Sequence, residues 1–342
     1  MKTIFIYLLF SFTYLFSQEY DVSIYLGAEK EALHHAKMIE PFHVAFDSKD
    51  NMYIVEYKGS RLDILDNQGQ FKQLGGDGTW NFSVENGPVE NAQFKGLHNI
   101  IIDDSDNVYI SDTFNDRCRM YNPKNGTIST FIGSGKKGYN TSPSRALDSK
   151  FNELYNVVFN QDKSKIIIAD LKNNRVRELD IKTNTVTTIA GNGKKGIPKD
   201  GDLAINAPLM NPRSVAVDSK GLIYIADRAG HALRVIKNGK IYTLVNKPGK
   251  KGIKLGNGVD AQLFGPKYVT TDADDNVWIA DDQNHRICLY NIKTKMLTSV
   301  IGKQSPIKNF KLNRPHGLAI HKNGTIFVAD SNNHRILKLV KK

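Results

Sequence analysis

Six copies of one short pattern run along almost the whole chain. Each copy contains a run of alternating apolar residues that ends in an acid, and successive acids lie 56, 58, 57, 54 and 49 residues apart. Self-similarity at such a period is the signature of a repeat architecture, in which each repeat packs against its neighbours. The acids are Glu56, Asp112, Asp170, Asp227, Asp281 and Asp330.

Each of the first five copies contains four period-two runs separated by turn residues, which predict four β-strands. In the second copy the predicted strands are 97–102, 108–112, 117–121 and 127–132. Six such meanders of about 55 residues fit an all-β, six-bladed β-propeller with four antiparallel strands in every blade.

The sixth copy contains only three predicted strands, because the chain ends shortly after Val340. The segment 22–27 has the pattern of the fourth strand in the other copies. We therefore predict that the N-terminal strand completes the last blade, with 22–26 beside 336–339. The same register places Cys118 and Cys288 three blades apart, which predicts two unpaired thiols.

The first 17 residues have the pattern of a secretory signal peptide. One cation, Lys2, precedes an apolar run from Ile4 to Phe16, which at about 13 residues is shorter than the roughly 20 of a membrane span. We expect cleavage after Ser17, a propeller over 18–342 and a secreted or periplasmic location, with a retained anchor as the alternative. Cysteine is absent near the cleavage point, which excludes a lipid-modified N-terminus.

The repeat resembles the NHL repeat. The resemblance rests on Pro-His-Gly-Leu-Ala-Ile at 315–320, Ile-Phe-Val-Ala-Asp at 326–330 and Asn-Asn-His-Arg-Ile-Leu at 332–337. The linker over 190–204 is also similar to the Gly-rich segments between blades of secreted bacterial NHL proteins. The resemblance implies the propeller fold, but such propellers include protein-binding platforms, RNA binders, sensor ectodomains, lyases and lactonases.

A residue type that recurs in every blade is expected to serve the fold. We predict that each repeated acid caps its own loop and pairs with the arginine five residues later, a position where blade 4 has Ala232 instead. The acidic segments 103–107 and 272–276 are interpreted as hairpin turns rather than calcium loops, since they lack the glycine and terminal glutamate of an EF-hand.

Positions that differ between copies are candidates for function. The start of each first strand should lie at the mouth of the central channel, 14 residues before the acid, or 15 in blade 3. Two interpretations are a solvated channel and a ligand site in which Arg213, Arg228 and Lys267 hold a carboxylate or sulfate. The mouth positions are Phe42, His98, Tyr155, Arg213, Lys267 and His316, each followed by His43, Asn99, Asn156, Ser214, Tyr268 and Gly317.

A third interpretation is metal catalysis. The layout resembles that of the peptidyl-hydroxyglycine lyases, which implies a zinc held by histidines such as His98 and His316, with His43 one position out of register and Arg228 or Tyr155 as helpers. Blade 4 departs from that pattern, because Arg213 stands where a neutral ligand is required. A lactonase-type calcium site could draw only on Glu56, Asn99 and Asn156.

Lysine pairs form a second candidate surface. Gly-Lys-Lys-Gly recurs at 135–138, 193–196 and 249–252, in linkers expected to face the channel mouth. The chain has 47 Lys and Arg against 35 Asp and Glu, a net charge of +12 that favours anionic partners. We rank an acidic glycan or a protein surface above nucleic acid as the partner.

The sequence therefore predicts a secreted, non-catalytic propeller that binds an anionic ligand on its channel-mouth face. The alternative is a zinc- or calcium-dependent lyase or hydrolase in the channel. The predicted ligand-binding residues are His98, Tyr155, Arg213, Arg228, Lys267, Tyr268, His316, Lys194, Lys195, Lys250 and Lys251.

Overall fold

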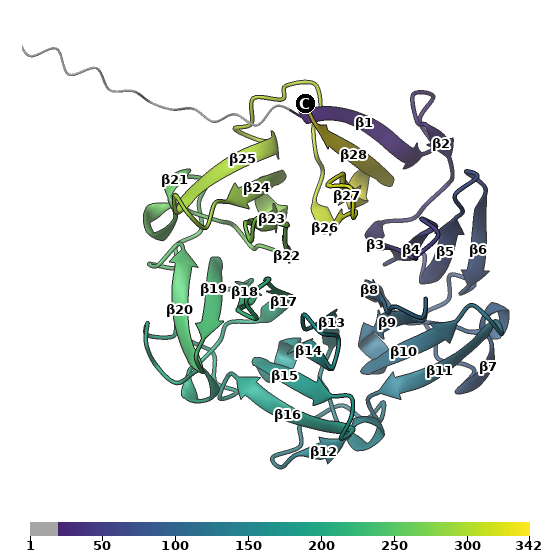
Figure 1. Cartoon of the computed structure of the whole chain (residues 1–342), viewed down its shortest axis with the longest axis horizontal. Helices are drawn as coiled ribbons and strands as arrows, with labels where there is room; N and C mark the ends of the chain where they lie inside the picture. Colours follow the sequence, from purple (N-terminus) through teal and green to yellow (C-terminus); the bar gives the residue numbers. More distant parts are fainter. Residues whose placement is uncertain (1–19) are drawn as a thin grey trace, which may run out of the picture.

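Six sheets, each antiparallel in its main strands, surround a central axis in the computed structural model, which describes residues 20–342 (Figure 1). In blades 1 to 5 the main strands follow one another from the axis outwards, so each sheet is one blade. The predicted all-β, six-bladed propeller is confirmed. The predicted signal segment 1–17 lies outside the described residues.

The main strands agree closely with the sequence pattern. Blade 1 contains β3 (Pro41–Phe46), β4 (Met52–Glu56), β5 (Arg61–Leu65) and β6 (Phe71–Gly75). Blade 2 contains β8 (Leu97–Ile102), β9 (Val108–Asp112), β10 (Arg117–Asn122) and β11 (Thr127–Ile132). Blade 3 contains β13 (Leu154–Phe159), β14 (Lys165–Asp170), β15 (Arg175–Asp180) and β16 (Thr185–Ala190).

The second half of the ring repeats the same plan. Blade 4 contains β17 (Pro212–Val217), β18 (Ile223–Asp227), β19 (Ala232–Lys237) and β20 (Lys240–Val245). Blade 5 contains β22 (Tyr268–Thr271), β23 (Val277–Asp281), β24 (Arg286–Tyr290) and β25 (Met296–Gly302). Blade 6 contains β26 (Pro315–Ile320), β27 (Ile326–Asp330), β28 (Arg335–Lys341) and β1 (Tyr20–Gly27).

The N-terminal strand closes the ring as predicted. β1 pairs antiparallel with β28, with Val22 opposite Leu339 and Leu26 opposite Ile336. The two ends of the described chain therefore share one blade, and the edge of β28 is covered.

The linkers add short elements that the sequence pattern did not predict. Four blades gain a fifth outer strand, and single turns of 3₁₀ helix lie in four of the linkers and directly after four of the repeated acids. The outer strands are β2 (His34–His35), β7 (Asn86–Pro88), β12 (Ser144–Arg145) and β21 (Gly256–Asn257). The 3₁₀ turns are Val89–Asn91, Thr113–Asn115, Ala146–Asp148, Leu171–Asn173, Ala204–Asn206, Gly258–Asp260, Asp282–Asn284 and Ser331–Asn333.

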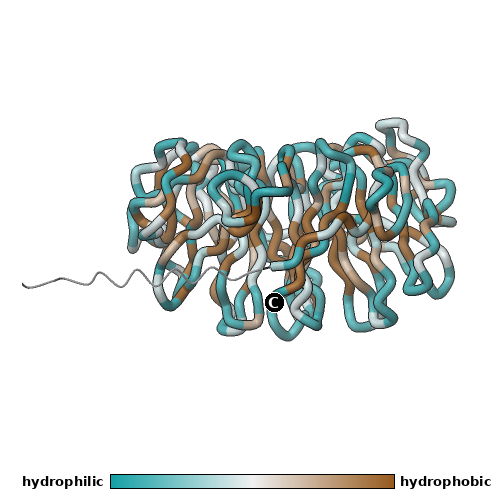
Figure 2. The backbone as a smooth tube through the Cα atoms, turned by 90° about the horizontal axis from the view of Figure 1, so that it is seen from above, coloured by the Kyte–Doolittle hydropathy of each residue, from teal (hydrophilic) through white to brown (hydrophobic). Residues whose placement is uncertain are grey.

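The core lies between the blades. Apolar side chains of neighbouring sheets pack face to face, as Trp278 of blade 5 does with Leu318 and Val328 of blade 6. Figure 2 shows the result as an apolar band between two polar rims. Cys118 and Cys288 are both buried and unpaired, as predicted. Within residues 20–342, no helix is long and apolar enough to cross a membrane.

The repeated acids are structural, but their arginine partners differ between blades. Glu56, Asp281 and Asp330 pair with the arginine five residues later, as predicted. In blades 2 and 3 that prediction is wrong, because a buried arginine seven residues after the acid takes its place. In blade 4, which has Ala232 at the fifth position, the acid likewise pairs with the arginine seven residues later. These pairs are Asp112–Arg119 at 3.8 Å, Asp170–Arg177 at 3.5 Å and Asp227–Arg234 at 2.7 Å.

The loops that follow the acids hold the linkers on the same face of the ring, which we call the mouth face. The asparagine three residues after the acid donates its side-chain amide to a linker carbonyl in four blades. Asn173, for example, donates to Gly138 at 2.7 Å, which fixes the first Gly-Lys-Lys-Gly linker. The turns at 103–107 and 272–276 lie at the other end of the strands, where Asp103 and Asp272 accept from backbone amides of their own turn.

Candidate functional site

The inner-strand residues at the mouth fill the channel. Phe42, His98, Tyr155, Lys267 and His316 are each 5% exposed or less. The interpretation as a ring of side chains around a water-filled channel is therefore wrong at this end, because six strands converge closely enough for large side chains to meet. Arg213 is the one member of this ring that remains partly exposed.

In four blades the next residue along the inner strand accepts a hydrogen bond from a neighbouring blade. Asn99 accepts from the Val157 amide, and Asn156 accepts from the Val215 amide, both at 2.9 Å. Ser214 and His43 make the same kind of link to Val269 and Ile100. Different residue types at these positions therefore serve the same purpose, which is to link the inner strands of neighbouring blades. Tyr268, a predicted ligand residue, is buried in this layer, where its hydroxyl accepts from Asn99.

Blades 1 to 3 supply an aromatic half of the mouth. His98 lies between Phe42 and Tyr155, with ring centroids 4.5 and 4.1 Å away. Above this layer Trp80 stacks on Phe114 at 5.4 Å, and Trp80 is 42% exposed. We define the aromatic half as Phe42, Tyr57, Trp80, His98, Phe114 and Tyr155.

Blades 4 to 6 supply a cationic half built around one carboxylate. Asp282 is fully buried and accepts two hydrogen bonds from Arg314, at 2.8 and 2.9 Å, and one from Arg228 at 3.1 Å. The Lys267 ammonium lies 3.9 Å from the same carboxylate and 2.5 Å from His316 Nε2. We define the cationic half as Arg213, Arg228, Lys267 and Arg314 around Asp282.

Positive charge exceeds negative charge in the cationic half. Within the described residues, no carboxylate lies within ion-pair distance of Arg213, whose guanidinium instead stacks 4.1 Å from the Tyr155 ring. Nearby Glu40 and Glu153 pair with Lys58 and Lys172. Arg228, Lys267 and Arg314 thus share one carboxylate while Arg213 has none, and the mouth carries an unbalanced positive field.

The shifts in pKa follow from this arrangement. Burial, with the neighbouring charge of Arg213, holds the pKa of Lys267 well below its ordinary value, although Asp282 favours the ammonium form. Burial alone would raise the pKa of Asp282, but Lys267 and the hydrogen bonds from Arg314 lower it to about 2. Burial and the adjacent cations also lower the pKa of His316, so its ring is neutral at pH 7.

The histidines of the metal hypothesis are engaged in other contacts. His98 lies 2.9 Å from the Gly96 carbonyl, and His43 bonds the Leu318 carbonyl at 3.0 Å. The Phe42 ring contacts both His98 and His316, whose Nε2 faces Lys267. Among residues 20–342 no group of three or more His, Cys, Asp or Glu side chains is arranged to hold a metal.

The residues considered for a calcium site also serve the fold. Glu56 is buried against Arg61, and the side-chain carbonyls of Asn99 and Asn156 are taken by backbone amides of the next blade. Tyr155 and Arg228, the suggested catalytic helpers, lie in the aromatic half and the cationic half respectively.

Sequence reasoning missed several residues of the mouth. Asp282 directly follows a repeated acid, at a position that is charged only there and at Arg228. Arg314 has a left-handed backbone, with φ of 54°, at a repeat position that is glycine in blades 2 and 5. Both departures from the repeat were visible in the sequence. Trp80 is a linker residue and carried no such signal.

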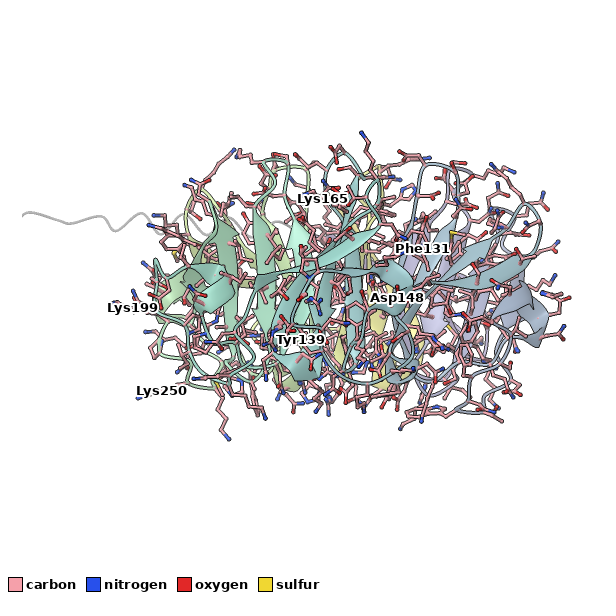
Figure 3. The ribbon with its side chains drawn as sticks, turned by 90° about the horizontal axis from the view of Figure 1, so that it is seen from below. Phe131, Tyr139, Asp148, Lys165, Lys199 and Lys250 are labelled. Atoms are coloured by element: carbon pink, nitrogen blue, oxygen red, sulfur yellow. The ribbon has the colours of Figure 1, made fainter. Side chains whose placement is uncertain are left out.

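The lysine pairs lie on the mouth face, as expected from their linkers. Lys194, Lys195, Lys250 and Lys251 are exposed. Gly193 and Gly252 accept hydrogen bonds from Asn174 and Asn284 of the mouth-face loops. Figure 3 shows Lys250 on the rim opposite to that of Lys165.

The channel is open at the other end. A cavity of about 370 Å³ is lined by His43 and Tyr268, and its walls also include Ala45, Val158 and Ala319. The central channel is thus a blind pocket on one face and a closed, charged surface on the other.

Comparison with known families identifies the repeat. The NHL repeat matches residues 312–339, and the Teneurin NHL domain matches residues 141–255. NHL repeat-containing protein 2 of Bos taurus is 25% identical over 90% of this chain and 47% of its own length. The chain spans about a quarter to a half of the length of the curated relatives that it matches.

Solved structures share the fold at low sequence identity. An auxiliary nutrient binding protein from Bacteroides ovatus has a TM-score of 0.65 at 13% identity, covering 96% of this chain and 74% of its own. A gluconolactonase from Xanthomonas campestris has a TM-score of 0.61 at 10% identity, covering 90% of this chain and 87% of its own. From its repeats, its relatives and its architecture, the described chain is a six-bladed β-propeller that matches NHL family models at 141–255 and 312–339.

Proposed function

We propose that this protein is a non-catalytic binding module that takes an anionic ligand across the channel mouth. The observation that carries the proposal is Arg213, a partly exposed cation beside Arg228 and Lys267 that has no carboxylate within ion-pair distance in residues 20–342. A carboxylate or sulfate of the ligand would supply the missing charge through the guanidinium fork.

The aromatic half favours a ligand with a flat apolar face next to its charge. Trp80 and Phe114 present a stacked surface, of which Trp80 is 42% exposed. Aromatic rings contribute large contact area at low entropic cost, while the cations fix the orientation of the charged group. A sugar ring that carries a carboxylate combines both features.

The lysine linkers extend the positive surface beyond the mouth. Lys194, Lys195, Lys250 and Lys251 are exposed on the same face, which suits a polymer better than a single small ion. An acidic polysaccharide is therefore our preferred ligand class, and a protein surface rich in carboxylates is the alternative. The signal-like segment 1–17 and the nutrient-binding relative of this fold are consistent with a role outside the cytoplasm.

Binding to polygalacturonate and dextran sulfate, measured by calorimetry in a salt series with neutral dextran as the control, tests the proposal. Arg213→Gln should weaken binding about tenfold with only a small loss of stability, because Arg213 has no ion pair to lose and gives up only its contact with the Tyr155 ring. Charge reversal of Lys194, Lys195, Lys250 and Lys251 should weaken binding and flatten its salt dependence.

The matched control reverses four exposed lysines in turns on the opposite face, namely Lys49, Lys124, Lys182 and Lys293. This variant has the same net charge as the mouth-face variant, so it separates local binding from the overall field. Equal loss in both variants, or unchanged affinity in Arg213→Gln, would refute the mouth as the binding site.

A further inference from the structure

Blade 3 contains a second pocket, away from the channel. It has a volume of about 360 Å³ and lies between the linker 139–143 and strands β15 and β16. Figure 3 shows Tyr139 on the same rim as Lys250. We call it the Tyr139 pocket, and its polar lining includes Tyr139, Arg175, Arg177, Thr187, Thr188 and Asn192.

Two arginines form the inner wall of this pocket. The Arg175 guanidinium lies 3.8 Å from the Tyr139 ring and donates to the carbonyls of Asn173 and Asn192, at 2.9 and 3.0 Å. Arg177 is buried, with Asp170 3.5 Å away. Within residues 20–342 no carboxylate lies within ion-pair distance of Arg175, and its buried Nε has no hydrogen-bond partner. The pocket therefore holds one uncompensated positive charge.

Blade 2 has the same construction with the charge balanced. Phe82 covers Arg117 at 4.0 Å, as Tyr139 covers Arg175. Arg119 pairs with Asp112, as Arg177 pairs with Asp170. In blade 2, however, Glu85 lies 3.7 Å from Arg117 and neutralises it.

The register between the two linkers identifies the missing acid. Trp80 bridges to Phe94 in blade 2, and Lys137 bridges to Phe151 in blade 3, so equivalent residues are 57 positions apart. The residue equivalent to Glu85 is therefore Ser142, which is exposed. Two arginines face two acids in blade 2, but they face one acid in blade 3.

We propose that the Tyr139 pocket binds a small ligand with one carboxylate or sulfate group, which takes the place of the acid that blade 3 lacks. The volume fits a ligand of about monosaccharide size. The anion would pair with Arg175. The Tyr139 and Thr188 hydroxyls hydrogen-bond to each other at 3.1 Å, and their remaining donor and acceptor capacity is available to polar groups of the ligand.

The pocket is flanked by two of the lysine linkers. Lys136 and Lys137 lie just before the 139–143 linker. Gly193 lies against the Arg175 guanidinium, so the next two residues, Lys194 and Lys195, are close to the pocket. These cations raise the local concentration of anions around the pocket. The Tyr139 pocket is separate from the mouth, and this inference does not depend on the proposed function.

Calorimetric titration of the full chain with glucuronate, with a 6-sulfated monosaccharide and with glucose tests this inference. Saturable binding of either charged sugar, but not of glucose, is expected, and the two charged probes distinguish a carboxylate from a sulfate preference. Absence of saturable binding of both charged sugars would overturn the proposal.

Substitutions in the Tyr139 pocket test whether the charged sugar binds there. Arg175→Gln should lower affinity at least tenfold, and Ser142→Glu should lower it by restoring the acid of blade 2. Arg175→Lys keeps the positive charge but loses the forked guanidinium, so its affinity should be intermediate. This variant also serves as a control in case Arg175→Gln fails to fold. Arg117→Gln, at the equivalent position of blade 2, should bind like the unaltered protein. Equal affinity of Arg175→Gln and the unaltered protein would overturn the assignment.

Discussion

Blades 1 to 3 and blades 4 to 6 follow one backbone plan but fill the mouth with different chemistry. At the start of the inner strand the first three blades have Phe42, His98 and Tyr155, and the last three have Arg213, Lys267 and His316. The position after the repeated acid divides in the same way. It is Tyr57, Thr113 and Leu171 in the first three blades, and Arg228, Asp282 and Ser331 in the last three.

The two halves are consequently stabilised by different forces. Ring packing among buried aromatic residues holds the first half, and it needs no charged partner. In the second half, Asp282 supplies the carboxylate that Arg228, Lys267 and Arg314 share. A repeat can therefore fix a backbone while leaving the chemistry of each sector free to change.

The largest expected effect comes from removing the shared carboxylate. Asp282→Ala leaves three cations without their partner in a buried site, which should lower the free energy of unfolding by about 3–5 kcal/mol. Denaturant unfolding measures this loss. Asp274→Ala, in an exposed turn of the same blade, should stay within about 0.5 kcal/mol of the unaltered protein. A loss below about 1 kcal/mol in Asp282→Ala would mean that the two halves are not held differently.

A smaller effect is expected in the layer beneath both halves. Burial lowers the pKa of His43 to about 4, against the hydrogen bonds that favour its charged form. As the pH falls, His43 binds a proton in the unfolded chain near pH 6.5 but in the folded chain only near pH 4. The stabilising contribution of neutral His43 to the free energy of unfolding is therefore fully present above about pH 6.5 and is lost as the pH falls towards 4. The loss amounts to about 3 kcal/mol.

The variant His43→Gln isolates the pH-dependent contribution of His43 to the free energy of unfolding. The difference in the free energy of unfolding between the two proteins should change between pH 6.5 and 4.5, because other titrating groups are common to both. A constant difference across that range would show that His43 does not titrate as a buried neutral ring.

The smallest expected effect concerns the exposed edge of the aromatic half. Trp80→Ala should weaken polygalacturonate binding roughly three- to tenfold, because the loss is one stacked ring at a partly exposed position. Stability should change little. Leu33→Ala removes an exposed apolar side chain next to the outer strand β2 of blade 6, and its binding should match that of the unaltered protein. Equal binding by Trp80→Ala would leave the cationic half as the whole site.

Repeat spacing predicted the fold almost completely. Strands such as 97–102 and 108–112 agree with the structure, and so does the pairing of β1 with β28. These features depend on the period of the apolar residues and on the turn residues, and both patterns recur in each copy of the repeat. The arginines seven residues after the acids of blades 2 to 4 were also readable, since that position is arginine in those three blades alone.

The state of the mouth could not be predicted in the same way. Spacing gives the register of a side chain along its strand, but not how closely six inner strands approach the axis. Phe42 and Tyr155 are large enough to close the channel, which only their combined packing reveals. Glu85 and Ser142 show the same limit, because the charge of a pocket depends on which residues from separate linkers and strands meet there.

The pairing of β1 with β28 also determines the order in which the molecule can be completed. Tyr20 lies opposite Lys341, so this contact joins residues from the two ends of the described chain, and contacts of such sequence separation form slowly. Until it forms, β28 presents an open edge that the β1 of another chain can occupy. Refolding at high protein concentration should therefore compete with strand exchange between copies, whereas dilute refolding favours the closed monomeric ring.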